Sequence, residues 1–171
     1  SITLYFPHFH QDTSWQTFYA IVNPSMATAS MVVTYYRADG SLISTEQSTL
    51  GPDRKIGRFA VSGIGWMFIQ SDTPVIGMLN FDDYHSRMGT VEYATPSATL
   101  YFPHYHQDGS WQTYYAIANP SSTSASVTVT YYRPDGSTIT TETLTLNAHS
   151  KIGRFPPTGI GWIKVESTVP I

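Results

Sequence analysis

Apolar and polar residues alternate along most of the chain, in short runs interrupted by turn-forming residues. The clearest run extends from Trp15 to Asn23, and in a strand its alternate side chains would lie on opposite faces. Asn23-Pro24-Ser25 ends this run, because proline cannot donate a hydrogen bond to a sheet. Similar runs predict seven strands in the first half of the chain, over residues 3–6, 15–23, 30–37, 42–50, 55–59, 66–70 and 75–81.

The segments between these runs are typical of tight turns. Ala38-Asp39-Gly40-Ser41 separates two of the expected strands, and the second half of the chain has Pro134-Asp135-Gly136-Ser137 at the matching place. Asp-Gly between β-rich runs is the strongest short signal of a hairpin. No segment has the apolar spacing of a helix, so the pattern predicts an all-β protein.

The chain repeats itself at a spacing of 96 residues. Leu4-Tyr5-Phe6-Pro7-His8 aligns with Leu100-Tyr101-Phe102-Pro103-His104, and the alignment continues without a gap to Ile171, with 46 identities in 75 paired positions. Solenoid repeats are shorter, at ~20 to 50 residues. We therefore expect two tandem domains, β-sandwich repeat 1 over residues 1–97 and repeat 2 over residues 98–171.

The number and spacing of the strands favour an immunoglobulin-like β-sandwich in each repeat. Residues 90–95 also alternate, and they could form an eighth strand beside residues 75–81. A jelly-roll-like sandwich of eight strands is therefore the alternative fold for each repeat.

Repeat 2 is the shorter copy. Val75 aligns with Ile171, so repeat 2 lacks the counterparts of residues 75–81 and 90–95. A sandwich that lacks a strand exposes an unpaired edge. Two explanations stay open: the sequence continues in a longer protein, or another subunit supplies the strand and the chain forms a homo-oligomer or filament by strand addition.

Composition and charge exclude several classes of partner. The net charge is −3, the pI is near 6.0 and the nine Lys and Arg residues are scattered, which does not favour nucleic acid. No apolar run approaches the ~20 residues that span a membrane. Residues 1–4 have neither the basic start nor the apolar core of a signal peptide, so we expect that any export signal has been removed. The absence of cysteine excludes disulfides, thiolate metal sites and cysteine nucleophiles.

The order of short motifs resembles that of a group of bacterial proteins. These motifs are Tyr-Phe-Pro-His, Trp-Gln-Thr with a strand ending in Asn-Pro-Ser, Tyr-Arg-x-Asp-Gly-Ser, Gly-Trp and Ser-x-x-Pro. The order resembles the tandem immunoglobulin-like β-sandwich repeats of large secreted or surface proteins of bacteria. The resemblance implies an extracellular or cell-surface stalk, adhesin or filament subunit. Its partners would be other protein subunits or surface glycans.

The His-x-His segments are the best candidates for a metal site. In an extended chain residues i and i+2 point to the same side, so two imidazoles and a carboxylate could hold Zn or Cu. Alternatively, these polar side chains lie on the surface of the loop after the first strand and form hydrogen bonds with Trp15 or with backbone groups. The candidate ligands are His8, His10 and Asp12 in the first copy, and His104, His106 and Asp108 in the second.

Aromatic residues near the histidines suggest a carbohydrate-binding alternative. Trp15 and Trp111, with Tyr5 and Tyr101, could form a platform on which sugar rings stack. The competing interpretation is that these rings fill the core, which we also expect for Trp66.

Charged residues and serines give weak functional signals. Lys55, Arg58, Lys151 and Arg154 occur in a repeated Lys-Ile-Gly-Arg-Phe segment, and such charges commonly protect an edge strand. We expect them to pair with Asp39 or Glu46. No serine lies in a nucleophile elbow and no carboxylate pair lies in a recognisable motif, so we expect no enzymatic activity.

Overall fold

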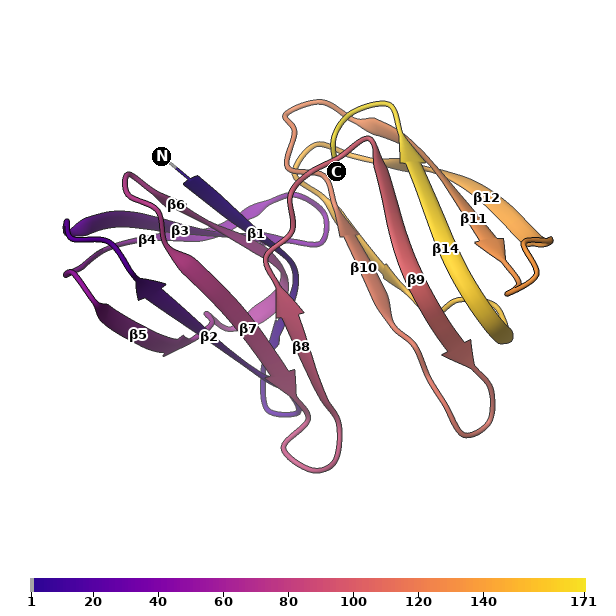
Figure 1. Ribbon diagram of the computed structural model, residues 1–171, viewed down its shortest axis with the longest axis horizontal. Helices are drawn as coiled ribbons and strands as arrows, with labels where there is room; N and C mark the ends of the chain where they lie inside the picture. Colours follow the sequence, from indigo (N-terminus) through magenta and orange to yellow (C-terminus); the bar gives the residue numbers. More distant parts are fainter. Residues whose placement is uncertain (1) are drawn as a thin grey trace. The chain divides into compact units, whose positions relative to one another are not determined.

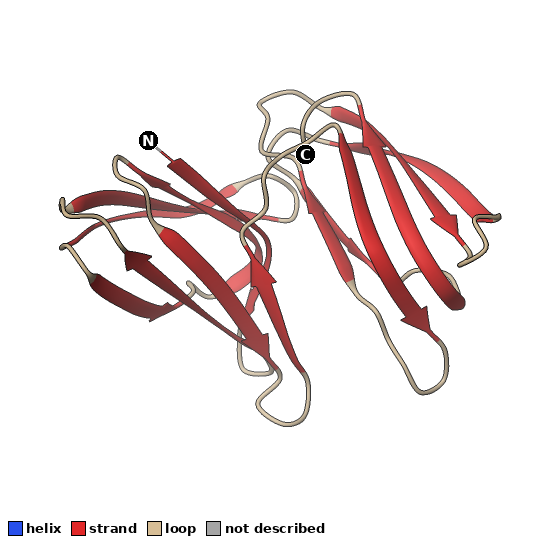
Figure 2. Cartoon of the chain, viewed as in Figure 1, coloured by secondary structure: helices blue, strands red, loops and turns tan. Residues whose placement is uncertain are grey.

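The computed structural model describes residues 2–171, and every regular element in them is a β-strand (Figure 2). All strand pairs are antiparallel. The all-β prediction is therefore confirmed. The chain divides into two compact units, Ser1–Thr95 and Pro96–Ile171. No helix long and apolar enough to cross a membrane occurs within residues 2–171.

The first unit contains eight strands in two four-stranded sheets, ordered β1-β6-β3-β4 and β5-β2-β7-β8 (Figure 1). The seven expected strands are present, and β8 is the eighth, paired with β7. The strands are β1 (Ile2–Gln11), β2 (Gln16–Asn23), β3 (Ala29–Arg37), β4 (Leu42–Leu50), β5 (Arg54–Phe59), β6 (Gly63–Ser71), β7 (Ile76–Asp82) and β8 (Met88–Glu92).

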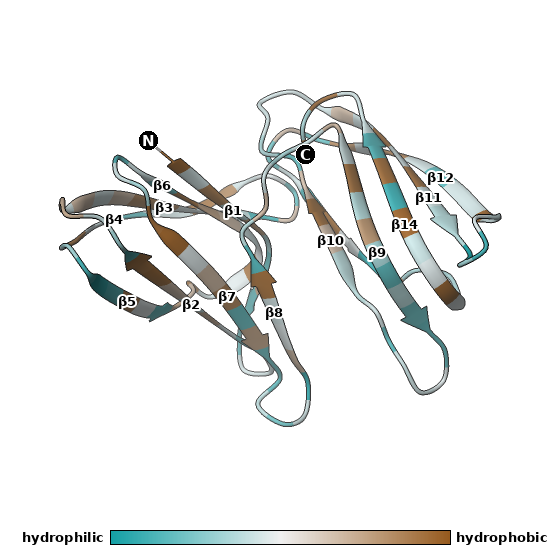
Figure 3. Cartoon of the chain, viewed as in Figure 1, coloured by the Kyte–Doolittle hydropathy of each residue, from teal (hydrophilic) through white to brown (hydrophobic). Residues whose placement is uncertain are grey.

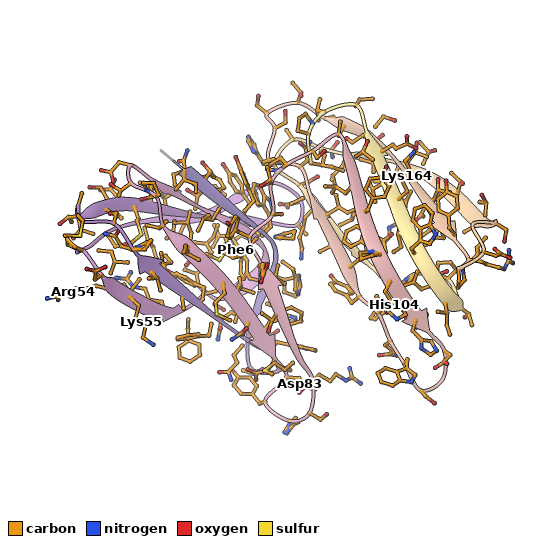
Figure 4. The ribbon with its side chains drawn as sticks, in the orientation of Figure 1. Phe6, Arg54, Lys55, Asp83, His104 and Lys164 are labelled. Carbon is orange, nitrogen blue, oxygen red and sulfur yellow. The ribbon has the colours of Figure 1, made fainter. Side chains whose placement is uncertain are left out.

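The core of this unit lies between its two sheets. Leu4 and Phe6 of β1 come from one sheet, Ile21 of β2 and Leu79 of β7 come from the other, and all belong to one buried cluster. Figure 4 shows Phe6 inside the unit. Each such side chain stabilises the fold by about 1.5–3 kcal/mol relative to an exposed one.

The Asp39-Gly40 segment forms the predicted hairpin turn between β3 and β4. Gly40 has a φ of 93°, which a residue with a side chain rarely adopts. The Asp39 carboxylate accepts a hydrogen bond of 2.8 Å from the backbone N–H of Ser41. In the second unit Asp135 and Ser137 make the same bond, at 2.9 Å.

Strand β5 lies at a sheet edge, as its charges led us to expect. It is the most hydrophilic strand of this unit in Figure 3, and Figure 4 labels Arg54 and Lys55 on it. The Arg58 guanidinium lies 3.7 Å from the Glu46 carboxylate, which confirms one expected ion pair.

The second unit contains six strands in two sheets, ordered β12-β11-β14-β9 and β10-β13. Apolar and polar bands alternate along β14 in Figure 3, and its inward residues Ile163 and Val165 are fully buried. The strands are β9 (Thr99–Gln107), β10 (Tyr115–Ala118), β11 (Ala125–Tyr132), β12 (Thr138–Leu146), β13 (Lys151–Arg154) and β14 (Gly159–Ser167).

Trp66 is fully buried, as expected, but not between the two sheets of its unit. It alternates along β6 with Met67, which belongs to the core cluster, so its side chain lies on the opposite face of the strand. On that face the Trp66 ring stacks on Tyr36 at a centroid distance of 5.1 Å. The prediction of burial is correct and the expected location in the core is wrong.

Candidate functional site

The turn between β1 and β2 is built around one carboxylate. Asp12 Oδ1 accepts hydrogen bonds from the backbone N–H groups of Ser14 and Trp15, at 2.7 and 2.9 Å. Asp12 Oδ2 lies 2.6 Å from His10 Nε2, and the His10 ring stacks on Trp15 at 5.8 Å. We call His10, Asp12 and Trp15, with their counterparts in the second unit, the His–Asp–Trp corner.

The second unit forms the same corner from His106, Asp108 and Trp111. His106 Nε2 lies 2.7 Å from Asp108 Oδ2, and the His106 and Trp111 rings stack at 5.9 Å. The backbone N–H groups of Ser110 and Trp111 donate to Asp108 Oδ1, both at 2.7 Å. The corner is therefore a repeated feature, as the sequence repeat requires.

Hydrogen bonding stabilises the charged form of the corner carboxylates. The backbone N–H of Ser14 is the main cause that lowers the pKa of Asp12, followed by the His10 side chain. The backbone N–H of Ser110 does the same for the pKa of Asp108. These contacts hold the turn in shape, which agrees with the alternative that the polar side chains bind backbone groups.

The structure brings His10 together with Asp12 but places His8 elsewhere. The pairing of β1 with β6 is irregular between Phe6 and Phe9, so simple i, i+2 alternation fails there. His8 is 8% exposed and its ring meets the edge of Phe81 at 5.2 Å.

In the second unit His104 is exposed on β9, where Figure 4 labels it. Among residues 2–171 no group of three His, Cys, Asp or Glu side chains is placed to share a metal ion. A Zn or Cu site formed by His8, His10 and Asp12, or by His104, His106 and Asp108, stays a prediction.

An open pocket of about 550 Å³ lies beside the corner of the first unit. One wall is the β1–β2 turn, and the other is the turn between β7 and β8, where Figure 4 labels Asp83. Aromatic, basic and acidic side chains all reach this pocket. It is lined by Thr13, Ser14, Trp15, Asp83, Tyr84, His85 and Arg87.

The expected site residues did not include the β7–β8 side of the pocket, because residues 82–88 do not alternate and contain no recognisable motif. The structure shows a hydrogen-bonded turn, in which Asp83 Oδ1 accepts from the backbone N–H groups of His85, Ser86 and Arg87, at 3.1, 2.9 and 2.9 Å. Tyr84 has a φ of 63°, and its hydroxyl donates to the Asp12 carbonyl at 3.3 Å. The available signal was the pair Asp82-Asp83 directly after a strand-forming run, because aspartate side chains accept hydrogen bonds from backbone N–H groups in turns.

The turn predicts an acid-sensitive first unit. The backbone N–H of Arg87 is the main cause that lowers the pKa of Asp83 to about 2. Because an aspartate in the unfolded chain has a pKa of about 3.9, the unfolded state binds more protons between these values. The contribution of the ionised Asp83 carboxylate to the stability of the first unit is therefore present above about pH 4 and is lost as the pH falls towards 2.

We expect Asp83→Asn to reduce this loss of stability of the first unit, as measured by urea unfolding at a series of pH values. The variant and the wild type are also compared at neutral pH, so that a general loss of stability is separated from the pH effect. An unchanged slope of stability with pH in the variant would contradict this explanation.

The aromatic residues proposed as a platform lie in two places. Tyr5 packs on Phe68, at 5.9 Å, and Trp15 packs on Phe81, at 6.0 Å. In the second unit Tyr101 is 62% exposed and its ring neighbour is Trp162, at 6.4 Å, whereas Trp111 is 64% exposed at the corner. The structure therefore separates each tyrosine from the tryptophan of its copy.

Among known proteins, this chain matches a solved structure at low sequence identity. No family model matches it, and a search of curated proteins finds no match. The chain is similar to one solved structure, the crystal structure of Thermotoga maritima 1070, at 14% identity and a TM-score of 0.47. That match covers 54% of this chain and 91% of the other.

Proposed function

We propose that this chain is a non-enzymatic structural or adhesive module of an extracellular bacterial multi-repeat protein, such as a stalk or filament subunit. Two units with the same bracing contacts suit a protein that gains length by repeating a stable shape. Its partners would be other protein subunits or surface glycans.

Within this proposal each unit is an immunoglobulin-like sandwich. Support comes from β2 lying beside β5 in one sheet and β3 lying beside β6 in the other, as the second and fifth, and the third and sixth, strands of such domains do. The outer strands follow another order, because β1 lies beside β6 and β7 lies beside β2.

One observation supports the proposed structural role most strongly. The polar contacts shared by the two copies all stabilise turns or connect strands. The hydroxyls of Tyr19 and Tyr35 connect a strand of one sheet to a strand of the other, for example. The pairs are Asn23 with Leu50 and Asn119 with Leu146, Tyr19 with Tyr35 and Tyr115 with Tyr131, Glu46 with Arg58 and Glu142 with Arg154, and Arg37 with Ser41 and Arg133 with Ser137.

Location on the cell tests this proposal. An antibody against the chain is expected to label intact source cells without permeabilisation, and treatment of those cells with an external protease is expected to remove the label. A cytoplasmic marker protein serves as the control for intact cells. Labelling that needs permeabilisation would overturn the extracellular role.

The pocket of the first unit favours a second candidate function, which is carbohydrate binding. Trp15 and Tyr84 contribute aromatic rings, and Arg87 and Asp83 contribute groups that can bind hydroxyls. Aromatic rings with a few convergent polar groups are typical of sites that orient sugars. The two turns are tied together by the Tyr84 hydroxyl, which would pre-form the site.

If sugars bind there, we expect Trp15→Ala to weaken binding by about tenfold or more, as expected for the loss of one stacked ring. The measurement is a glycan array followed by calorimetry with the best oligosaccharide. Arg87→Ala, at an exposed position, gives a second test that does not remove core contacts. Trp111→Ala is the matched control, because no counterpart of the β7–β8 turn faces that corner in the described part of the second unit. Equal effects of the two tryptophan variants on sugar binding, or the absence of any bound sugar, would exclude the pocket as a carbohydrate-binding site.

A further inference from the structure

The outer face of the β5-β2-β7-β8 sheet in the first unit is largely apolar. In antiparallel sheets the face that meets solvent is commonly polar. Here the inward residues Tyr19 and Leu79 are buried, and the residues that alternate with them point outward. Six large apolar side chains are exposed on the outer side, from 37% for Phe18 to 76% for Met88. We call them the apolar face: Phe18 and Val22 on β2, Phe59 on β5, Ile76 and Met78 on β7, and Met88 on β8.

The side chains of the apolar face are neighbours across the strands. Ile76 pairs with Val22, and Phe18 pairs with Phe59. Side chains paired in this way lie on the same face, with about 4.5–5.5 Å between their Cβ atoms. They therefore form a contiguous surface, and exposed apolar surfaces of this kind mark interaction sites in proteins.

The other sheet of the same unit has a polar outer strand. On β4 the outward residues are Thr45, Gln47 and Thr49, which pair with β3 and are exposed. Polar outward side chains are thus compatible with a sheet of this unit. The apolar face is therefore not a requirement of the fold.

A glycine holds an aromatic pair in place on this face. A Cβ at Gly57 would lie 2.4 Å from Phe18 Cζ, so the Phe18 ring lies directly over the glycine. The Phe59 ring meets the Phe18 ring edge-on at 5.5 Å. Tyr114 and Phe155 form the same pair in the second unit, at 5.4 Å. The pair is pre-formed and repeated, which lowers the entropic cost of binding a partner.

The two edge strands of the sheet carry opposite charges on this side. Lys55, labelled in Figure 4, pairs with Val22 on β2, and Glu92 of β8 pairs with Met78 on β7, so both point outward. Both are exposed, and neither forms an ion pair within residues 2–171. A complementary partner therefore presents an acidic group beside β5 and a basic group beside β8.

A second copy of the same face meets this requirement in one orientation. Sheets that pack face to face keep their strands within about 30° of each other, so a two-fold axis lies either across the strands or along them. An axis across the strands brings β5 against β5, and like charges meet. An axis along the strands brings β5 of one copy against β8 of the other, and opposite charges meet on both sides.

We propose that two copies of this chain associate through their apolar faces, around a two-fold axis parallel to the strands, with Lys55 of each copy beside Glu92 of the other. Removal of the six apolar side chains from water drives the association. The charges select the orientation. Each copy uses the same surface, so the assembly closes as a dimer. This inference does not rest on the proposed extracellular role.

Analytical ultracentrifugation of the full chain at increasing concentration tests the association. The apparent mass is expected to rise about twofold from the 19.0 kDa of one chain. Met78→Lys places a charge within the apolar face and is expected to weaken the association by at least about tenfold. The new side chain lies opposite Glu92 of its own chain, so the fold is retained, as circular dichroism verifies. Gln47→Lys on the polar strand β4 is the matched control and is expected to have no effect.

Charge reversal tests the orientation. Lys55→Glu and Glu92→Lys each bring like charges together, and each is expected to weaken the association by about threefold or more. An equal mixture of the two variants restores opposite charges on both sides and is expected to associate like the wild type. A monomer at every concentration, or a dimer that Met78→Lys leaves intact, would overturn the proposed interface. Single reversals that leave the association unchanged would overturn the proposed orientation.

Discussion

Replacing Gly65 by alanine is expected to destabilise the first unit by about 3 kcal/mol or more. Gly65 lies in β6, opposite Phe9 on one side and Arg37 on the other. An added Cβ would lie 1.8 Å from the carbonyl oxygen of Tyr36 and 2.8 Å from its carbonyl carbon. Backbone atoms held in a sheet cannot move aside as a flexible side chain can, so the two strands must separate locally.

Urea unfolding of the purified chain measures this effect. Gly161→Ala is the equivalent change in the second unit, where the Cβ would lie 1.8 Å from the Tyr132 carbonyl oxygen. Because the two units have separate cores, we expect each variant to lower its own transition only. Gly109→Ala is the control, since no atom lies within 4 Å of its added Cβ. A loss of stability for Gly65→Ala no larger than for Gly109→Ala would contradict the close approach of β6 to the Tyr36 carbonyl.

Removal of the Asn23 side chain is expected to have the second large effect, a loss of about 3 kcal/mol in the first unit, because buried groups lose their partners. Asn23 is 0% exposed. Its Nδ2 donates to the carbonyls of Ala27 and Leu50 at 2.7 and 2.8 Å, and its Oδ1 accepts from the backbone N–H of Ser25 at 3.0 Å. After Asn23→Ala these backbone groups have no comparable partner.

Asn119→Ala tests the same contact in the second copy, where Nδ2 donates to Thr123 and Leu146 at 2.7 and 3.1 Å. Asn80→Ala is the control at a half-buried position, where Oδ1 accepts one exposed hydrogen bond from Thr90. We expect the control to cost less than about 1 kcal/mol. If Asn23→Ala and Asn80→Ala have the same free energy of unfolding, the buried amide does not brace the fold.

The strands could be predicted from the sequence because each depends mainly on local alternation and on the turns beside it. The run from Trp15 to Asn23 became β2, and Asp39-Gly40 became the turn between β3 and β4. Alternation alone does not show which face of a strand meets the core. For this reason the predicted location of Trp66, in the core between the sheets, was wrong.

Other parts of the candidate site depend on contacts that are distant in the sequence. The irregular pairing near His8 arises where β1 meets β6, and this pairing cannot be inferred from the His-x-His spacing. The pocket likewise requires Trp15 and Tyr84 to meet through the pairing of β2 with β7. Such features become visible only when the strand order is known.

One structural unit occurs twice in this chain, and among the strands of residues 2–171 β2 has neighbours on both edges whereas β10 pairs with β13 alone. Amide hydrogen exchange of the full chain without ligand tests it most directly. We expect slow exchange over residues 16–22 and fast exchange over residues 112–118, while the paired strands β3 and β11 are protected alike. Equal protection of residues 16–22 and 112–118 in a monomeric chain would contradict the claim.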